Sequence, residues 1–240
     1  MPLLQQLQEG YSNGERLLAV LIDPDKINAQ TLSLTLANAT RAKANIVMVG
    51  GSLVDGDTDA AVRLVKEQTH IPVVLFPGNA MHFASSADAI FLLSLISGRN
   101  PDFLIGNHVH VAGALKRSGI EVIPVGYMLI DGGVATSVQY MSNTMPIPSA
   151  KIDIAVATAL AGEQLGLKAI YLEAGSGAAN PVPHELIAAV CRNVTIPVIV
   201  GGGIRSAKQL QAAYQAGATM VVVGNALEKN PELLLEFGAR

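Results

Sequence analysis

Short, wholly apolar runs alternate along the chain with longer amphipathic segments. The apolar runs are rich in Val, Ile and Leu and are followed by Gly, Pro, Asp or Asn. They lie at 17–22, 46–49, 73–76, 89–93, 122–125, 169–172, 198–200 and 220–223. Strands buried on both faces have this composition, whereas half-exposed strands would alternate apolar and polar residues. The segments between them predict helices over 28–43, 57–69, 104–118, 151–165, 183–192, 206–216 and 226–237.

Eight strands separated mostly by helices predict an α/β protein whose parallel sheet closes into a (β/α)8 TIM barrel. The 240 residues suit one such domain spanning 1–240, because barrels of this class commonly run to roughly 200–250 residues. An open, doubly wound sheet is the alternative, since the number of strands alone does not exclude it.

Two connections depart from the regular pattern. Residues 77–88 contain Pro, Gly and Ser and have no apolar period, so we expect a loop where the barrel normally has a helix. Residues 126–148 form the opposite case, a long segment after the fifth strand. Long loops after barrel strands lie at the catalytic face, so this segment is a candidate lid or substrate wall.

Composition narrows the class of protein. Half of the residues are apolar, 15% are charged and the net charge is −3, which excludes a disordered chain and argues against nucleic acid as a partner. No apolar run reaches the roughly 20 residues of a spanning helix, and the N-terminus lacks the pattern of a secretory signal. The single cysteine, Cys191, fits a small core residue. We therefore expect a cytoplasmic protein.

Three glycine-rich turns follow the last three strands directly, at 173–178, 201–205 and 224–226. Glycine lets the backbone approach a ligand closely, and successive N–H groups near a helix start form an anion cradle. Barrels commonly bind phosphate in the loops after strands seven and eight. Each turn alone is weak evidence, because glycine also ends strands for conformational reasons. Together the three turns predict a bound phosphate monoester.

The first two strands end in candidate metal ligands. Asp23 lies at the tip of the first strand, and Pro24 disfavours helical geometry there, so the carboxylate can point over the barrel mouth. One carboxylate beside a bound phosphate suits Mg²⁺. Helix capping is the alternative, and it fits Asp25 better than Asp23. Ser52, after the second strand, completes the magnesium shell or caps the helix that starts near Asp57.

Tyr171 and Glu173 alternate on the sixth strand and therefore point to the same side. A carboxylate at the strand end, near bound phosphate, can accept a proton from a hydroxyl nucleophile. The alternative for Glu173 is a buried ion pair with Arg205 or Lys26. The histidines are scattered without a metal-ligand spacing, so no zinc site is expected.

At these motifs the chain resembles the geranylgeranylglyceryl phosphate synthase family. The matching segments are LIDPDK (21–26), VGGS (49–52), YLEAGSGA (171–178), VGGGIRS (200–206) and VVVGNALEKNP (221–231). The family fold is a modified TIM barrel that lacks one helix, in agreement with the short 77–88 connection. Related branches use heptaprenyl diphosphate. A bacterial branch has a Lys two residues before the first-strand Asp, and Leu21 at that position favours the geranylgeranyl branch.

The resemblance implies a prenyltransferase that joins the 3-hydroxyl of sn-glycerol 1-phosphate to geranylgeranyl diphosphate and releases diphosphate, as a step in ether lipid synthesis. Asp23 and Ser52 would hold Mg²⁺, and Glu173, with Tyr171 beside it, would take the proton. The residues expected to bind glycerol 1-phosphate are Tyr171, Leu172, Glu173, Ala174, Gly175, Ser176, Gly177, Gly202, Gly203, Gly224 and Asn225. The family forms dimers or larger homo-oligomers. Its lipid donor implies transient contact with a membrane surface, although no basic amphipathic helix is evident.

Two other classes of function share some of these features. A phosphosugar isomerase barrel has the same phosphate loops but would not need Mg²⁺. A catalytically silent barrel would serve as a binding module, but the carboxylates at the strand ends argue against it.

Overall fold

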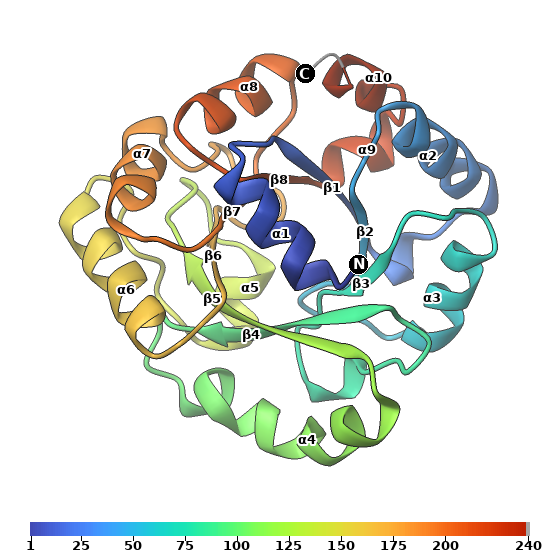
Figure 1. Ribbon diagram of the computed structural model, residues 1–240, viewed down its shortest axis with the longest axis horizontal. Helices are drawn as coiled ribbons and strands as arrows, with labels where there is room; N and C mark the ends of the chain where they lie inside the picture. The colour runs from blue at the N-terminus through green and yellow to red at the C-terminus, as the bar shows by residue number, and fades with distance from the viewer. Residues whose placement is uncertain (239–240) are drawn as a thin grey trace.

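Eight parallel strands form a closed barrel in the computed structural model, which describes residues 1–238 (Figure 1). The strands are β1 (Leu17–Ile22), β2 (Ile46–Val49), β3 (Val73–Leu75), β4 (Ala89–Leu95), β5 (Glu121–Leu129), β6 (Ala169–Glu173), β7 (Val198–Gly201) and β8 (Met220–Val223). All eight lie where the apolar runs predict them, and β8 pairs with β1 to close the barrel. The predicted (β/α)8 barrel is confirmed, and the open sheet is excluded.

Most of the helices surround the barrel and join successive strands (Figure 1). The helices are α1 (Leu3–Ser12), α2 (Ala29–Arg41), α3 (Thr58–Lys66), α4 (Asn107–Ser118), α5 (Ser137–Ser142), α6 (Ile152–Gln164), α7 (His184–Asn193), α8 (Ala207–Gln215), α9 (Asn225–Lys229) and α10 (Leu233–Phe237). Of these, α1 precedes β1, whereas α9 and α10 follow β8. No helix among the described residues combines the length and the hydropathy that a membrane span requires.

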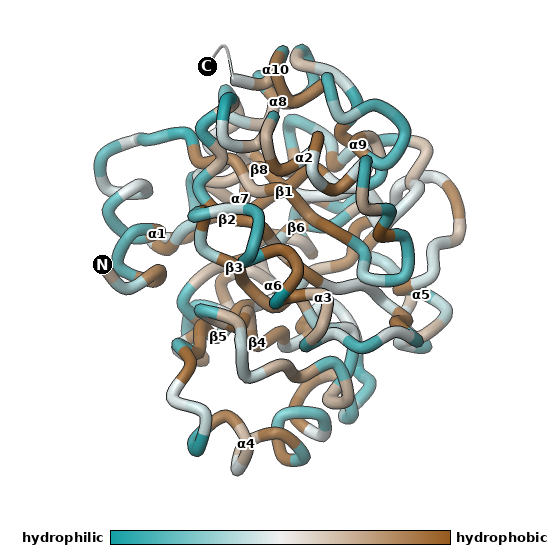
Figure 2. Tube along the Cα trace, turned by 90° about the vertical axis from the view of Figure 1, so that its right-hand side faces the viewer, coloured by the Kyte–Doolittle hydropathy of each residue, from teal (hydrophilic) through white to brown (hydrophobic). Residues whose placement is uncertain are grey.

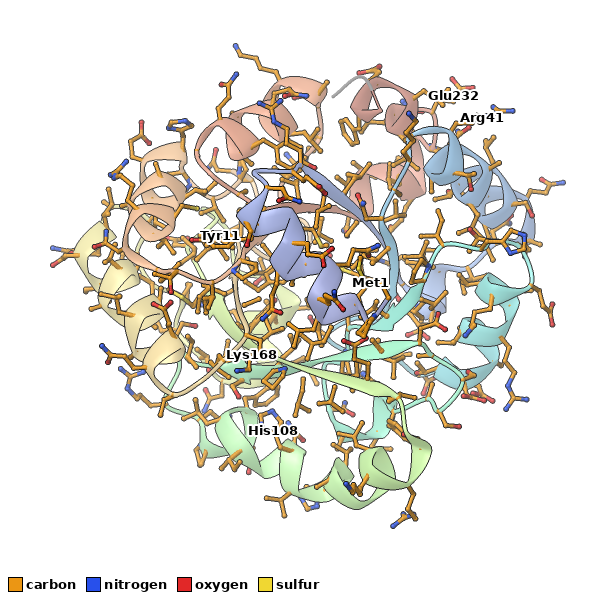
Figure 3. The ribbon with its side chains drawn as sticks, viewed as in Figure 1. Met1, Tyr11, Arg41, His108, Lys168 and Glu232 are labelled. Atoms are coloured by element: carbon orange, nitrogen blue, oxygen red, sulfur yellow. The ribbon has the colours of Figure 1, made fainter. Side chains whose placement is uncertain are left out.

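Alternate residues of each strand enter two different apolar layers. Leu18 and Val20 of β1 pack outward against the helices, whereas Leu17 and Ala19 belong to the cluster inside the barrel. This division follows from the period of two along a strand. It explains why the runs are apolar throughout: both faces are buried, and Figure 2 shows the strands as the most hydrophobic part of the trace. Charged side chains such as Arg41 and Glu232 lie at the periphery (Figure 3).

The helix that normally joins the third and fourth strands of such a barrel is missing, as the sequence predicts. Between β3 and β4 the chain forms only a short 3-10 turn, Ala80–His82. The buried His82 ring stabilises this loop, because its Nδ1 accepts a hydrogen bond of 3.2 Å from the Gly78 N–H. Local hydrogen bonds thus replace the packing of a helix.

The N-terminal end of the barrel is closed by α1, a helix that the sequence analysis does not anticipate. It lies across the near end of the barrel in Figure 1, and Leu3 and Leu7 join the interior cluster. The Glu121 carboxylate accepts hydrogen bonds from the N–H groups of Leu3 and Leu4, at 2.6 and 2.8 Å. A residue 117 positions away therefore satisfies the helix start, which no local sequence pattern reveals.

Two predicted segments differ in detail from the structure. The single helix expected over 226–237 is divided into α9 and α10, because Pro231 disfavours helical geometry in Asn230. In the long segment after the fifth strand, residues 126–129 extend β5 and α5 follows. Figure 2 shows α5 at the opposite side of the molecule from α1. This segment therefore lies at the open end of the barrel, as expected for a substrate wall.

Candidate active site

The carboxyl ends of the strands surround a polar cavity of about 330 Å³. The cavity brings together residues that are more than 200 positions apart in the sequence, such as Asp23 and Glu228. The expected site residues that line it are Asp23, Ser52, Tyr171, Glu173, Gly175, Ser176, Gly177, Gly202, Gly203, Gly224 and Asn225. Nearly every candidate residue thus contributes to one site.

Leu172 and Ala174 are the exceptions among the expected site residues. Both are buried, and their side chains belong to the outer layer between the strands and the helices. They alternate with Tyr171 and Glu173, which face the cavity. The Ala174 N–H donates to the Gly201 carbonyl at 3.1 Å, so it links β6 to β7.

Glu173 is buried at the cavity wall, with 6% of its surface exposed. Burial raises the pKa of this carboxyl from its usual 4.5 to about 7, although the Gly175 N–H and the Tyr171 hydroxyl act to lower it. The Gly175 hydrogen bond to Oε1 is 2.7 Å long. Gly202, with φ +79°, leaves room for Oε1, since a Cβ there would collide with it. A carboxyl with a pKa near neutrality suits proton transfer.

The ion pair considered for Glu173 is absent from the described residues. Lys26 pairs instead with Asp23 and Glu228. Arg205 donates to the carbonyl oxygens of Ala178 and Ala179. Glu173 therefore has no cation to hold it ionised, and it remains available as a base.

Tyr171 is fully buried below Glu173, and its hydroxyl has no hydrogen-bond partner among the described residues. The hydroxyl is near enough to the Glu173 carboxylate to act on its pKa. The ring stacks on Phe76 with centroids 5.2 Å apart and contacts Tyr127 at 5.4 Å. Burial holds the pKa of Tyr171 well above its ordinary value, so the hydroxyl keeps its proton. An unpaired buried donor at a cavity wall is a natural contact for an anionic ligand.

Asp23 and Ser52 lie on neighbouring strand ends at the other side of the cavity. Asp23 Oδ1 accepts a hydrogen bond of 3.2 Å from the Asp25 N–H, and Gly51 lies beside the same oxygen. The prediction that Asp25 is the better helix cap is wrong. Asp23 caps the 3-10 turn Pro24–Lys26, while Asn28 caps α2.

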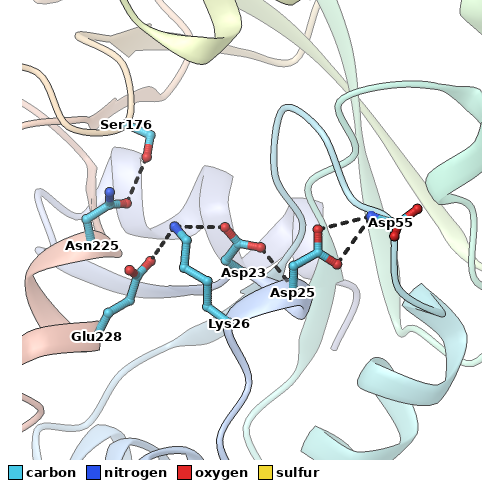
Figure 4. A network of polar contacts seen from close by, with 7 residues as sticks. All are labelled: Asp23, Asp25, Lys26, Asp55, Ser176, Asn225 and Glu228. Atoms are coloured by element: carbon cyan, nitrogen blue, oxygen red, sulfur yellow. Dashed lines mark hydrogen bonds and ion pairs between the residues drawn. The ribbon is translucent and has the colours of Figure 1, made fainter.

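Asp25 has a different task, which concerns the loop that follows Ser52. Its carboxylate accepts a hydrogen bond of 3.0 Å from the N–H group of Asp55 (Figure 4) and one of 2.9 Å from that of Gly56. These bonds hold the pKa of Asp25 below its ordinary value. The capping alternative for Ser52 also fails, because Asp57 caps α3. Asp25 thus fixes the position of the second strand-end loop relative to Asp23.

The described residues contain no group of three His, Cys, Asp or Glu side chains that could hold a metal ion. One carboxylate and one hydroxyl would leave most of the coordination sphere of an ion to other ligands. Mg²⁺ accepts such a site, because it commonly takes one or two carboxylates, water and the phosphates of a substrate. The donor set of Asp23 and Ser52 therefore fits Mg²⁺ that arrives with a phosphorylated ligand.

The opposite wall of the cavity is made of backbone and small polar groups. Gly202, Gly203 and Gly224 line it, and the Ser176 hydroxyl donates to Asn225 Oδ1 at 2.9 Å (Figure 4). This contact ties the loop after β6 to the start of α9. Backbone N–H groups at such a concave surface suit a phosphate group.

A second, apolar cavity extends from Ser52 between the barrel and α4. Its apolar lining includes Phe76, Phe83, Ile90, Leu92, Leu93, Leu95, Phe103, Tyr127, Val111, Val138 and Met141. His108 Nε2 lies 2.9 Å from the Leu93 carbonyl oxygen and ties α4 to the strand. Gly51, Ser52, Phe76, Tyr127 and Val138 line both cavities. We call the apolar cavity the channel; it adjoins the polar cavity at Ser52.

Several residues of the site are not among those expected from the sequence. Asp25, Lys26 and Glu228 form its charged network, and Tyr127 and Val138 separate the two cavities. Lys26 follows the first-strand motif directly, so proximity to Asp23 was a usable signal. Glu228 and Val138 had none, because only the folded chain brings them to the cavity.

Comparison with known proteins agrees with this geometry. The sequence profile of the PcrB family matches residues 13–237. The chain belongs to the PcrB family. Relatives that match nearly the whole chain carry the name that the motifs suggest, which confirms the resemblance.

Three relatives of this PcrB family member are informative. A geranylgeranylglyceryl phosphate synthase of Spirosoma linguale is 51% identical over 229 residues, which cover 95% of this chain and 92% of the relative. One of Thermococcus gammatolerans is 44% identical over 217 residues, covering 90% and 85%. The crystal structure of the Thermoplasma acidophilum enzyme with sn-glycerol-1-phosphate has a TM-score of 0.92 at 33% identity, covering 99% and 96%.

Proposed function

We propose that this PcrB family member is a geranylgeranylglyceryl phosphate synthase, a prenyltransferase of ether lipid synthesis. It joins the 3-hydroxyl of sn-glycerol 1-phosphate to geranylgeranyl diphosphate and releases diphosphate. Relatives that match nearly the whole chain carry this name. The relative of known structure binds the glycerol phosphate, and its fold is nearly identical.

The observation that carries the proposal is the meeting of a polar and an apolar cavity at Ser52. A phosphorylated alcohol fits the polar cavity, with its hydroxyl toward Glu173. A prenyl tail fits the channel, and its diphosphate would then lie at the junction beside Asp23. This arrangement keeps the nucleophile and the allylic carbon on the same side of the barrel mouth.

The channel holds about 80 Å³, which is small for a long tail. It adjoins a further cavity of about 320 Å³ that Asp102, Asn107 and His110 help to line. Both cavities share Ser52, Phe103 and Met141. We infer that channel side chains move aside when the tail enters and that the second cavity provides additional space.

Glu173 acts as the general base in this proposal. It accepts the proton of the 3-hydroxyl, whose oxygen forms the new bond to the allylic carbon. The bond from that carbon to the diphosphate breaks, and its electron pair leaves with the diphosphate. Mg²⁺ held by Asp23 and Ser52 would neutralise charge on this leaving group. The burial that raises the pKa of Glu173 to about 7 makes it a stronger base than an exposed carboxylate.

The test is incubation with radiolabelled glycerol 1-phosphate and geranylgeranyl diphosphate, with Mg²⁺ or with EDTA, followed by organic extraction. We expect label in the organic phase with Mg²⁺ and none with EDTA. Extraction of label in both samples would remove the metal from the proposal. Failure to extract label with any prenyl donor would refute the prenyltransferase activity and favour a sugar phosphate as substrate.

The heptaprenyl donor is less favoured. Leu21 lines the polar cavity at the position where the heptaprenyl branch has a Lys, and the relatives quoted above are named for the geranylgeranyl group. An isomerase is also less favoured, because it has no use for an apolar channel beside its phosphate site.

We further propose that the protein forms a homo-oligomer. Large apolar side chains are exposed in the segments that follow β3, β4 and β5, namely Met81, Ile105, Val109, Tyr140 and Met145. Contact with a second copy of the chain would remove these side chains from water.

A further inference from the structure

Lys26 forms a bridge between two carboxylates at the edge of the polar cavity (Figure 4). Its Nζ lies 3.0 Å from Asp23 Oδ2 and 3.1 Å from Glu228 Oε1. The bridge joins the turn after β1 to α9, and all three side chains line the cavity. Lys26 thus places a positive charge between Asp23, the expected metal ligand, and the glycine-lined wall expected to bind phosphate.

Both oxygens of Asp23 are engaged in the free protein. The Asp25 N–H donates to Oδ1, and Lys26 contacts Oδ2. A divalent cation that binds Asp23 meets an ammonium group at the same carboxylate, and the two positive charges repel each other. This repulsion favours release of Lys26 from Oδ2 when a metal binds Asp23.

The charges around the cavity indicate where the ammonium group goes. The charged side chains that line it are Asp23, Asp25, Lys26, Glu173, Arg205 and Glu228. Arg205 is occupied by the carbonyl oxygens of Ala178 and Ala179. Of these two cations, Lys26 contacts only carboxylates among residues 1–238, and its long stem lets the ammonium group turn. Two phosphorylated substrates bring further negative charge to a cavity already rich in carboxylates.

We propose that Lys26 contacts the diphosphate of the prenyl donor and stabilises it as the leaving group. When the metal takes Asp23, the ammonium group turns to the phosphoryl oxygens and stays anchored by Glu228. Lys26 is then a catalytic residue, and Glu228 is the residue that positions it. The inference rests on the proposed transferase function and on Asp23 as a metal ligand.

The same geometry has a consequence for metal binding. In the free protein Lys26 opposes the metal, so Asp23 binds Mg²⁺ weakly until a diphosphate draws the ammonium group away. Metal and diphosphate should accordingly bind together, each strengthening the other.

Titration calorimetry on three variants tests the proposal, with inorganic pyrophosphate as the probe. Lys26→Met should weaken pyrophosphate binding in the presence of Mg²⁺ at least tenfold. The same variant should bind Mg²⁺ alone severalfold more tightly, because the competing charge is gone. Glu228→Gln should weaken Mg²⁺ binding, since Lys26 is then held by Asp23 alone. Lys229→Met, an exposed neighbour on α9, is the matched control and should leave both affinities unchanged.

Mg²⁺ affinity should rise in Lys26→Met and fall in Glu228→Gln. These opposite changes separate this role from a structural one, because general damage to the site would weaken the binding of Mg²⁺ and pyrophosphate in both variants. Wild-type pyrophosphate affinity in a folded Lys26→Met protein would overturn the proposal. So would an unchanged Mg²⁺ affinity in that variant. A wild-type protein that bound no pyrophosphate with Mg²⁺ and transferred no prenyl group would instead refute the proposed function itself.

Discussion

Glu173 shows how much of the chemistry depends on the surroundings of one side chain. The same carboxyl on a surface strand would be ionised at neutral pH and weakly basic. Here the barrel wall removes it from water, and no cation compensates among the described residues. Burial without an ion pair is what raises its pKa. The position of the residue on β6 therefore decides its reactivity.

Replacing Glu173 with Gln should reduce kcat by about 10²–10⁴-fold, because the glycerol hydroxyl loses its proton acceptor. In the wild-type protein, kcat/KM should rise with pH and level off above about 7, where the carboxyl ionises. The residual activity of the variant should lack this rise. Steady-state assays from pH 5.5 to 8.5 would measure both effects. Wild-type turnover in the variant at saturating substrate would exclude Glu173 as the base.

The same variant should also change stability in a pH-dependent way. The folded protein binds the Glu173 proton more tightly than the unfolded chain, whose carboxyl has the usual pKa of 4.5. Wild-type stability is therefore lost as the pH rises from 4.5 through about 7. Glu173→Gln avoids this loss, so its Tm relative to wild type should be higher at pH 8 than at pH 5. Equal Tm differences at both pH values would contradict the raised pKa.

At the scale of elements, the channel is formed by the loop between β3 and β4 and by α4. In place of a helix between β3 and β4 the chain has the short turn Ala80–His82, and Phe83 after it lines the channel. α4 forms the other wall, preceded by a π-helical turn, Asp102–Gly106. A regular barrel would fill this space with a helix. The irregular connection therefore creates room for an apolar ligand.

Filling the channel should affect the prenyl donor alone. Val111 of α4 is buried and lines the channel, so Val111→Trp should raise the KM for geranylgeranyl diphosphate at least tenfold. The KM for a donor with a short tail should rise much less, and the affinity for glycerol 1-phosphate should stay unchanged. The matched control is Ala112→Trp on the same helix, where the side chain is exposed and does not line the channel.

Kinetics with donors of increasing tail length would measure the effect, and circular dichroism would verify the fold of both variants. An equal increase in KM for all donors would mean that the tail does not occupy the channel.

At the scale of the whole molecule, the two ends of the barrel differ in kind. α1 closes one end with apolar side chains, and Glu121 secures its start. The other end holds the polar cavity, the channel and the exposed apolar side chains in and after α5. Assembly through the open end would cover apolar surface and leave the closed end in water.

Oligomerisation should depend on this surface. Tyr140 is 86% exposed and Met145 is 82% exposed, so the double change to Ser should shift the assembly toward monomers. Leu165→Ser is the control, because Leu165 is 79% exposed beside α6. Analytical ultracentrifugation would compare the three proteins. A wild-type protein that sediments as a monomer would refute the homo-oligomer, and an unchanged assembly in the double variant would relocate its interface.

The strands and most helices were determined by sequence alone, because their apolar runs and amphipathic periods are local patterns. Asp23, Ser52, Glu173 and the glycine turns were also readable, since each directly follows a strand and parallel strands end on one face. The tertiary structure decided what depends on distant contacts. α1 is secured by Glu121, Lys26 meets Glu228 of α9, and the pKa of Glu173 follows from burial. No local pattern encodes these features, because they arise only when remote segments exclude water together.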